Sequence, residues 1–274
     1  MRIRRLHISG VAIAVTVALH AHSASAFQEW QEQAAPACAQ SIAASDAGVW
    51  IVGCNNGIGN DSAVYWRNSS GSFQRVTSSF AVATQVGVSV NGHVWIINKA
   101  GSIREVESPK ANGTSDLTAV FYGTATQNGI AVDANNDVYI RALDDNAWEW
   151  NGSAWSSLGA PGGPANWISF FDASTTFGEI TEVTQSGFFW QGGVLGWTQL
   201  AGGSGTLLAN HMTLAGTKLF YYNDATNVWT QDTIALPVAA SSVRGIANEY
   251  DPTLKIGLPW LIDTSGNIWE ENNN

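Results

Sequence analysis

A unit of about forty residues recurs along the chain and restricts what it can fold into. Each unit has a strand of small and β-branched residues, a turn rich in Gly or Asn, and a strand with an aromatic residue, as in "GVSVNGHVWII" and "GIAVDANNDVYI". The aromatic positions of the first three units, Trp50, Trp95 and Tyr139, are 45 and 44 residues apart. Self-similarity at this period is typical of repeat architectures such as propellers.

A third strand follows in every unit and gives the count of units. Its copies are "AVYWRN", "GSIREV", "NAWEWN", "GFFWQG", "NVWTQ" and "GNIWEE". A fourth strand is visible as "SFQRV", "AWSSL" and "GWTQL". The six copies predict an all-β, six-bladed β-propeller of four-stranded antiparallel blades. Small residues of the first strand suit the crowded axis, and Trp and Phe fill the widening space between blades.

The first 26 residues are predicted to be a signal peptide. Arg2, Arg4 and Arg5 precede the apolar run "ISGVAIAVTVAL", which ends at the small residues "SASA". This order fits export and cleavage before Phe27, and the run is too short to span a bilayer stably. We therefore expect a single propeller domain over residues 27–274 that is secreted or periplasmic and does not insert into a membrane.

The mature N-terminus supplies a strand without a hairpin partner. "FQEWQEQ" reads as a fourth strand that lacks its first three, whereas the last unit, which ends "GNIWEENNN", has three strands and no fourth. We expect the two to pair, so that the N-terminal strand closes the ring and leaves no free edge there. An open β-sandwich with a loose N-terminal arm is the alternative.

The charge of the chain excludes some partners. The formal net charge is −10, and removal of the predicted signal peptide with its three arginines brings it to about −13. Binding of nucleic acid requires clustered Lys and Arg, which the chain lacks, and anionic lipid headgroups are disfavoured for the same reason.

Cys38 and Cys54, the two cysteines of the chain, flank the turn "SDAG", and the midpoint between them, residue 46, lies inside that turn. In an antiparallel hairpin centred on that turn they would face each other across the strands, at a separation that a disulfide can span. Export makes oxidation plausible, so a structural disulfide is expected, with two buried thiols as the alternative.

The repeat resembles the tectonin-type repeats, on the segments "NGHVWIINKAGSIRE" and "DTSGNIWEE". This resemblance implies a propeller and, since many tectonin-like proteins are lectins, recognition of cell-surface glycans, including methylated sugars and lipopolysaccharide. The fourth and fifth units, with "FGEITEV" and "KLFYYND", lack the expected Trp. Sites that repeat between blades are therefore altered or absent there.

Sugar binding also has a physical rationale in the residues themselves. A pyranose offers an apolar face to an aromatic ring, and its hydroxyls bind polar side chains beside it. Trp148 and Trp150 are expected on one side of a strand and Glu149 on the other. Trp150 with Asn151 is the favoured platform, and packing between blades is the alternative role for every Trp. The full set of expected ligand-binding residues is Trp150, Asn151, Trp148, Trp66, Trp190, Trp229 and Trp269.

Catalytic motifs are not found in the sequence, so no enzyme activity and no cofactor are expected. HExxH, CxxC and GxSxG spacings are absent, and His93 and His211 read as turn or packing residues. Asp133 to Asp144 echo a calcium loop, but an ordinary Asx-rich turn is favoured, because Val138 replaces the required glycine.

Two other function classes stay open. The first is an exported propeller hydrolase or lyase that acts on polysaccharide, because acid and base carboxylates can come from different blades. The candidates for these roles are Asp144, Asp145, Glu149, Glu179, Glu182, Asp224, Glu249, Asp251 and Asp263. The second is a protein-interaction scaffold without a glycan site.

Overall fold

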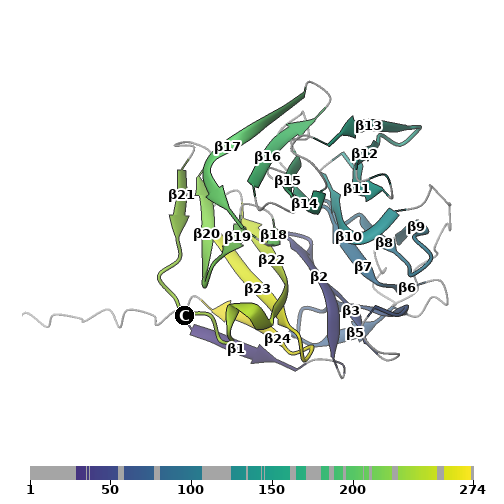
Figure 1. Cartoon of the computed structure of the whole chain (residues 1–274). Helices are drawn as coiled ribbons and strands as arrows, with labels where there is room; N and C mark the ends of the chain where they lie inside the picture. Colours follow the sequence, from purple (N-terminus) through teal and green to yellow (C-terminus); the bar gives the residue numbers. More distant parts are fainter. Residues whose placement is uncertain are drawn as a thin grey trace, which may run out of the picture.

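The protein is an all-β propeller, in which antiparallel sheets follow one another around a common axis (Figure 1). The computed structural model describes residues 29–34, 36, 38–54, 59–76, 81–106, 125–133, 135–142, 144, 146–160, 165–170, 180–184, 188–193, 196–205, 207–209, 212–223, 228–251 and 256–272. The predicted signal peptide lies outside these residues. Among them, no helix is long and apolar enough to cross a bilayer.

The first half of the chain forms three sheets. One sheet contains β2 (Ala39–Ser45), β3 (Gly48–Gly53), β4 (Ser62–Arg67), β5 (Phe73–Arg75) and β6 (Val82–Ala83). The next contains β7 (Gln85–Val88), β8 (Val94–Ile97) and β9 (Ile103–Val106). The third contains β10 (Ala125–Val132), β11 (Val138–Ala142), β12 (Ala147–Trp150) and β13 (Trp155–Gly159).

The second half continues the same order. One sheet contains β14 (Ala165–Phe170), β15 (Ile180–Thr184), β16 (Phe188–Gly193) and β17 (Gly196–Ser204). Another contains β18 (Leu207–Ala209), β19 (Met212–Ala215), β20 (Lys218–Asn223) and β21 (Val228–Gln231). A short 3-10 helix, η1 (Ala240–Ser242), leads into β22 (Val243–Asp251), β23 (Ile256–Asp263) and β24 (Ile268–Asn272), which share their sheet with β1 (Glu29–Gln33).

The prediction of six four-stranded blades is wrong. Within the described residues, five blades have three or four strands, and the sheet built on β2 has five. In that sheet the outer edge of β4 pairs with β5 at Tyr65 to Arg67 and with β6 at Ser62 and Ala63, so the expected fourth strand is divided in two. The sheet of β7 has three described strands, and residues 107–124, which follow β9, lie outside the description.

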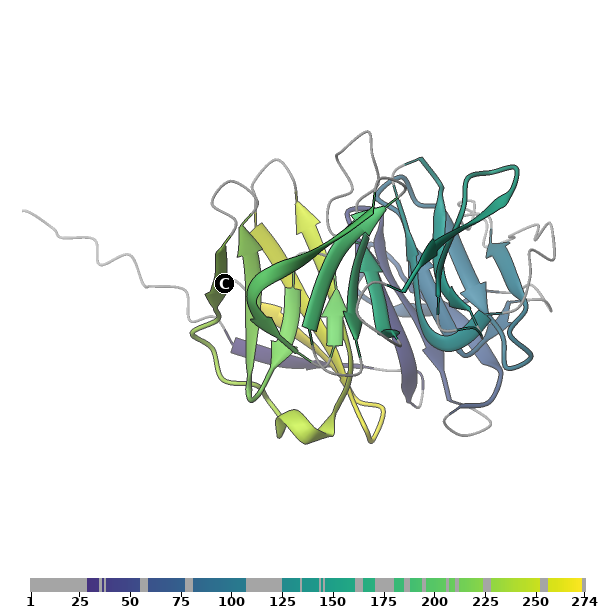
Figure 2. The ribbon, with the colours of Figure 1, turned by 45° about the horizontal axis from the view of Figure 1, so that its top comes forward.

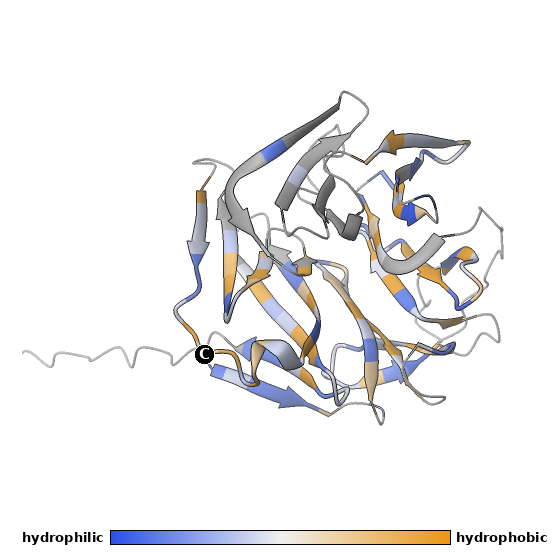
Figure 3. Cartoon of the chain, in the orientation of Figure 1, coloured by the Kyte–Doolittle hydropathy of each residue, from blue (hydrophilic) through white to orange (hydrophobic). Residues whose placement is uncertain are grey.

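The predicted pairing of the N-terminal strand is confirmed. β1 pairs antiparallel with β24, with Trp30 opposite Glu271, and so completes the sheet of β22, β23 and β24 (Figure 2). This strand is largely hydrophilic, whereas hydrophobic residues run along the strands next to it (Figure 3). An edge position in the sheet explains this, because the outer face and outer edge of β1 are open to water.

The innermost strands form a closed ring. β2 contacts β7 and β22, β10 contacts β7 and β14, and β18 contacts β14 and β22. The hydrophobic clusters lie between neighbouring sheets: Trp50 packs with residues of β7 and β8, Trp95 with residues of β10 and β11, and Trp260 with residues of β2 and β3. Large aromatic residues therefore fill the space between sheets that the repeat predicted.

Within the part of the chain that the structure describes, five turns of one design shape the ends of the sheets. In each, a side-chain oxygen of the first residue accepts a hydrogen bond from the backbone N–H of the fifth, and the fourth residue has a positive φ. These turns are 68–72, 89–93, 98–102, 133–137 and 263–267. Four of the five carry Gly at the fourth position, and Asn136 occupies it in the remaining turn.

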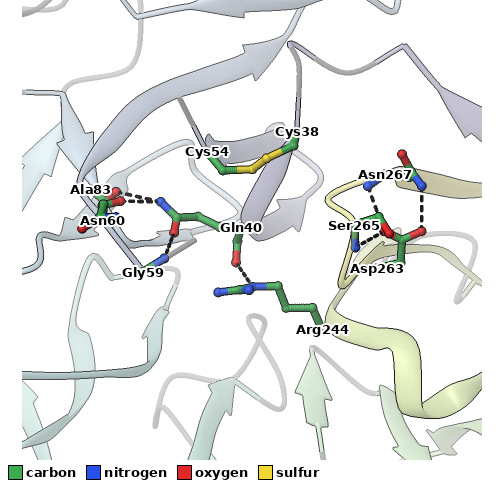
Figure 4. The surroundings of a disulfide bond; sticks show 10 residues. All are labelled: Cys38, Gln40, Cys54, Gly59, Asn60, Ala83, Arg244, Asp263, Ser265 and Asn267. Atoms are coloured by element: carbon green, nitrogen blue, oxygen red, sulfur yellow. Dashed lines mark hydrogen bonds between the residues drawn. A yellow bond between two sulfur atoms is a disulfide. The ribbon is translucent and has the colours of Figure 1, made fainter. Parts of the chain in front are cut away.

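The predicted disulfide between Cys38 and Cys54 is confirmed, with the two Cα atoms 5.4 Å apart. It lies directly beyond the paired residues Ala39 and Gly53, as expected for a hairpin centred on the intervening turn. Figure 4 shows it next to the turn of Asp263. The backbone N–H of Ala39 donates to the carbonyl of Gly266 at 2.8 Å, so the disulfide lies where the first sheet meets the last.

Candidate functional site

The predicted alternation along β12 is found in the structure. Trp148 lies opposite Ile140 and Trp150 opposite Val138, whereas Glu149 lies opposite Tyr139 on the other face. Trp148 and Trp150 pack against the cluster that contains Trp95, and both remain half-buried. Trp150 also forms a tilted pair with Trp155, with ring centroids 5.7 Å apart. These two indoles have both a packing contact and some exposed surface.

Asn151 is exposed at the turn that follows Trp150. Its side-chain oxygen accepts hydrogen bonds from the backbone N–H of Ser153 and of Ala154, at 3.1 Å each, and from the Ser153 hydroxyl at 2.8 Å. Asn151 therefore stabilises its own turn, and its role toward a sugar stays a prediction.

The other predicted tryptophans lie on different sheets and are not brought together. Trp66 packs with Trp50 toward β7 and β8, and Trp269 packs with Leu261. Trp190 and Trp229 are half-buried on β16 and β21. The sequence thus located several separate aromatic positions and no single binding surface.

Among the residues with described side chains, a polar arrangement that the sequence interpretation missed recurs in three sheets. In each, an aromatic residue of the second strand lies directly opposite a glutamate of the third. The pairs are Trp95 with Glu105, Tyr139 with Glu149, and Trp260 with Glu270. The three aromatic residues are 1%, 1% and 0% exposed. Each glutamate therefore lies opposite a side chain that is fixed by the surrounding core.

The name Glu105 cleft is used here for the first of these places, the boundary between two sheets at which five side chains lie: His93, Trp95, Glu105, Asn136 and Trp150. The Trp95 Nε1 donates to Asn136 Oδ1 at 2.7 Å, and Asn136 Nδ2 donates to Glu105 Oε1 at 3.1 Å. His93 Nδ1 lies 3.1 Å from the same Glu105 oxygen. The side chains of His93 and Glu105 are 44% and 28% exposed, so solvent reaches the polar end of this network.

Two neighbouring sheets build the Glu105 cleft. Glu105 comes from β9, and Asn136 comes from the turn between β10 and β11. Trp150 joins it because it pairs with Val138, two residues after Asn136, and it packs in the cluster of Trp95. The cleft therefore combines a carboxylate, an amide, an imidazole and a half-buried indole.

The second place, the Glu270 cleft, consists of Gln33, Arg67, Glu249, Trp260 and Glu270. Arg67 Nη2 donates to Glu270 Oε2 at 3.1 Å and to Gln33 Oε1 at 3.5 Å, and the guanidinium lies 4.8 Å from the centroid of the Trp260 ring. Arg67 comes from β4 of the first sheet, and the other four residues come from the last sheet. Burial raises the pKa of Glu270 and of Glu249, and Arg67 opposes the rise at both.

The third glutamate, Glu149, accepts a hydrogen bond from the Tyr139 hydroxyl at 3.2 Å. Asp133 and Asp137 lie near the same tyrosine and, through their charge, help to raise its pKa, although burial is the main cause. Burial also raises the pKa of Asp133, of Asp137 and of Glu149. These carboxyl groups hold protons more strongly than exposed ones.

The Asx-turn interpretation of the calcium-like segment is confirmed at Asp133. Its Oδ1 accepts hydrogen bonds from the backbone N–H of Asn135 at 2.9 Å and of Asp137 at 2.8 Å. Over the described part of the chain, no group of three or more His, Cys, Asp or Glu side chains is placed to hold a metal ion.

The remaining candidates for catalysis divide into two groups. Asp144 and Asp263 each accept a hydrogen bond from an indole, of Trp148 and Trp269 respectively, and hold their own turns. Burial alone would raise the pKa of Asp263, but hydrogen bonds led by those from Asn267 outweigh it and lower the pKa. The carboxylates Asp145, Glu179 and Asp224 lie outside the described residues, as does His211, which was expected to be a turn or packing residue, and the side chains of Glu182 and Asp251 are not described.

Comparison with known proteins shows the fold. A streptogramin B lyase is 12% identical, with a TM-score of 0.58 over 91% of this chain and 99% of that one. The SapL1 lectin in complex with alpha methyl fucoside is 12% identical, with a TM-score of 0.57 over 88% and 95%. The WD40 β-propeller domain of Doa1 is 10% identical, with a TM-score of 0.54 over 90% and 98%. Similarity at this identity shows a propeller and no particular function.

No family model and no curated protein matches the chain. The resemblance to tectonin repeats therefore extends to the propeller fold, which a lectin shares, and membership of that family is not shown.

Proposed function

We propose that this protein binds carbohydrate without catalysis, through the clefts between neighbouring blades. The observation that carries the proposal is the recurrence of one arrangement in different sheets, a glutamate held opposite a buried aromatic residue. In two clefts a donor from the next sheet binds the glutamate, Asn136 in one and Arg67 in the other. Glu105 is half-exposed and Glu270 is buried, and a fold that only needed packing has no reason to repeat a carboxylate at this place.

The chemistry of the Glu105 cleft suits a sugar. A carboxylate and the amide or guanidinium beside it can accept from and donate to two adjacent hydroxyls of one ring, and such charge-assisted hydrogen bonds are the stronger ones. Trp150 and Trp155, which are both half-buried, offer apolar ring surface for the C–H face of the same sugar. The fold similarity to a lectin in complex with alpha methyl fucoside agrees with this reading.

Several clefts around one ring would act together. A single shallow site binds one sugar weakly, but linked sites gain avidity where the spacing of glycans on a surface matches their own. We therefore propose glycans of cell surfaces, including methylated sugars and lipopolysaccharide, as partners. The disulfide supports export to an oxidising compartment, as a secreted or periplasmic protein.

Binding to an immobilised glycan tests the proposal. Residues 27–274 would be compared with Glu105→Gln and Trp150→Ala, on the glycan that the wild-type protein retains best. Each change should weaken binding by about tenfold, roughly 1.4 kcal/mol, because it removes a charged acceptor or an apolar platform. Glu29→Gln, at an exposed position of β1, is the matched control and should bind like the wild type. Unchanged binding by both cleft variants would contradict the proposal.

A catalytic function is the second candidate, favoured by one observation. Asp133, Asp137 and Glu149 lie together with raised pKa values, a property of many acid and base catalysts. Turnover of a polysaccharide that is lost in Glu149→Gln, with the fold retained, would establish this function in place of simple binding.

A further inference from the structure

The innermost strands carry register shifts at the ends where they begin. In β2 the shift lies between Ala39 and Ser41, and in β22 it lies between Val243 and Gly245. Gln40 and Arg244 are therefore extra residues that have no cross-strand partner. Such bulges turn a side chain away from its normal direction, out of the face of its own sheet.

The two bulges meet between the first sheet and the last. Arg244 Nε donates to the backbone carbonyl of Gln40 at 3.0 Å, which satisfies the carbonyl that the bulge leaves out of the ladder. The Gln40 side chain is turned elsewhere, since its Oε1 accepts from the backbone N–H of Gly59 at 2.7 Å and its Nε2 donates to the carbonyl of Asn60 at 2.7 Å. Figure 4 shows the guanidinium of Arg244 extending beyond Gln40.

The charge of Arg244 has no carboxylate partner among the described residues. Its Nε contact is to a neutral carbonyl, and neither terminal nitrogen bonds a described residue. Arg244 is half-buried, and burial lowers its pKa. By contrast, Arg67 has Glu270 at 3.1 Å. A partly desolvated guanidinium without an anion is costly, which makes an anion from solution a favourable partner.

The geometry of the two bulges points to an anion-binding site at Arg244, at the inner end of the junction between the first and last sheets. Its ligand is a small oxyanion, a carboxylate such as that of an acidic sugar or a phosphate, bound by the two terminal nitrogens of the guanidinium. Carboxylate and phosphate fit this planar fork with two parallel hydrogen bonds. The site lies at the start of β22, whereas Glu249 of the Glu270 cleft lies near the end of the same strand, so the inference does not depend on the proposed function.

Calorimetric titration of residues 27–274 tests the inference, with sodium glucuronate and sodium phosphate as probes and glucose as the uncharged control. Ionic strength and pH are held constant, because the net negative charge of residues 27–274, about −13, repels anions at low salt. Binding of either oxyanion, with a dissociation constant in the millimolar range and no heat from glucose, supports the site. The two arms show whether the carboxylate or the phosphate is preferred.

Variants distinguish binding at Arg244 from non-specific attraction of anions to other basic residues. Arg244→Gln should weaken oxyanion binding by at least about tenfold, and Arg244→Lys should retain part of it. Arg75→Gln, at an exposed position of β5, should bind like the wild type. Binding that survives in Arg244→Gln, or a folded wild-type protein that binds neither probe, would overturn the inference. The titration compares folded proteins at one temperature, so a loss of stability in Arg244→Gln does not mimic the result.

Discussion

Asn136 is the residue on which the Glu105 cleft depends. It has a φ of 68° at a turn position where the four matching turns use Gly. A residue other than Gly is unfavourable in that region, and here the side chain offsets the cost by linking Trp95 to Glu105. Asn136 is therefore the exception to the turn pattern because its side chain forms hydrogen bonds with two other residues.

Replacement of Asn136 should separate the side-chain contacts from the backbone strain. Asn136→Gly keeps a suitable backbone but leaves the Trp95 N–H without its acceptor, so the free energy of unfolding should fall by about 1–3 kcal/mol. In Asn136→Ala the free energy of unfolding should be lower by about 1–2 kcal/mol more, because Ala is strained at positive φ. Urea denaturation measures both, and equal stability of Asn136→Gly and the wild type would refute the role of the side chain.

Gly266 and Gly216 form a matched pair for the contact with the disulfide. Both have positive φ, but a Cβ at Gly266 would collide with the Cβ of Cys38, whereas a Cβ at Gly216 has no atom within 4 Å. Gly216→Ala should cost about 1–2 kcal/mol of strain. Gly266→Ala should lower the free energy of unfolding clearly more, and guanidinium denaturation of both variants measures the difference. A similar loss of stability in both variants would mean that the disulfide and the turn of Asp263 can move apart.

The sheet that joins the two chain ends shows how far sequence reasoning reaches at the scale of elements. The last unit lacked a fourth strand and the N-terminal strand lacked a partner, which predicted that the two would pair. In the structure β1 pairs with β24. The division of the fourth strand along β4 was not predicted, because counting third strands does not reveal whether an outer edge pairs with one segment or with two. Edge pairing depends on the turns after the strand and leaves little periodic signal.

The disulfide should stabilise this junction. Replacement of both Cys38 and Cys54 by Ser releases a loop with a sequence separation of 16, which the chain-entropy account values at about 3 kcal/mol. The double variant and the reduced wild-type protein should therefore unfold at similar, lower denaturant concentrations. A double variant as stable as the oxidised protein would show that the hairpin and the turn of Asp263 need no covalent support.

Glu271 of β24 gives the junction with β21 a dependence on pH. Burial, together with the neighbouring Asp232, raises the pKa of Glu271 to about 8, and Tyr221 donates to Asp232 at 3.3 Å. Because the folded protein holds this proton more strongly than the unfolded chain, its stabilising effect is full below the unfolded pKa, about 4.3, and is lost as pH rises toward 8.

Glu271→Gln should remove that part of the pH dependence. The amide stays neutral and can still donate to Asp232, so the variant should melt at a higher temperature than the wild type near pH 8 and at a similar temperature near pH 5. Thermal unfolding across this range measures the difference. Parallel curves for the two proteins would place the titrating group elsewhere.

At the scale of the whole molecule, the clefts explain what sequence reasoning could find and what it could not. Glu105, Glu149 and Glu270 each follow their aromatic partner by ten residues, a spacing that aligned repeats would reveal. Asn136 and Arg67 could not be assigned in this way, because each comes from the next sheet and meets its glutamate only in the closed ring. The sequence pointed to indoles such as Trp150, which lie beside these polar groups.

The central claim is that the clefts between neighbouring blades bind glycans. The most direct test is binding of the purified, folded protein, residues 27–274, to a broad glycan array that includes methylated sugars and bacterial lipopolysaccharides. We expect specific signals on a related set of glycans that the free sugar competes away, and that Glu105→Gln reduces. An array without signal, from protein shown to be folded, would contradict the account and leave the tryptophans with a packing role alone.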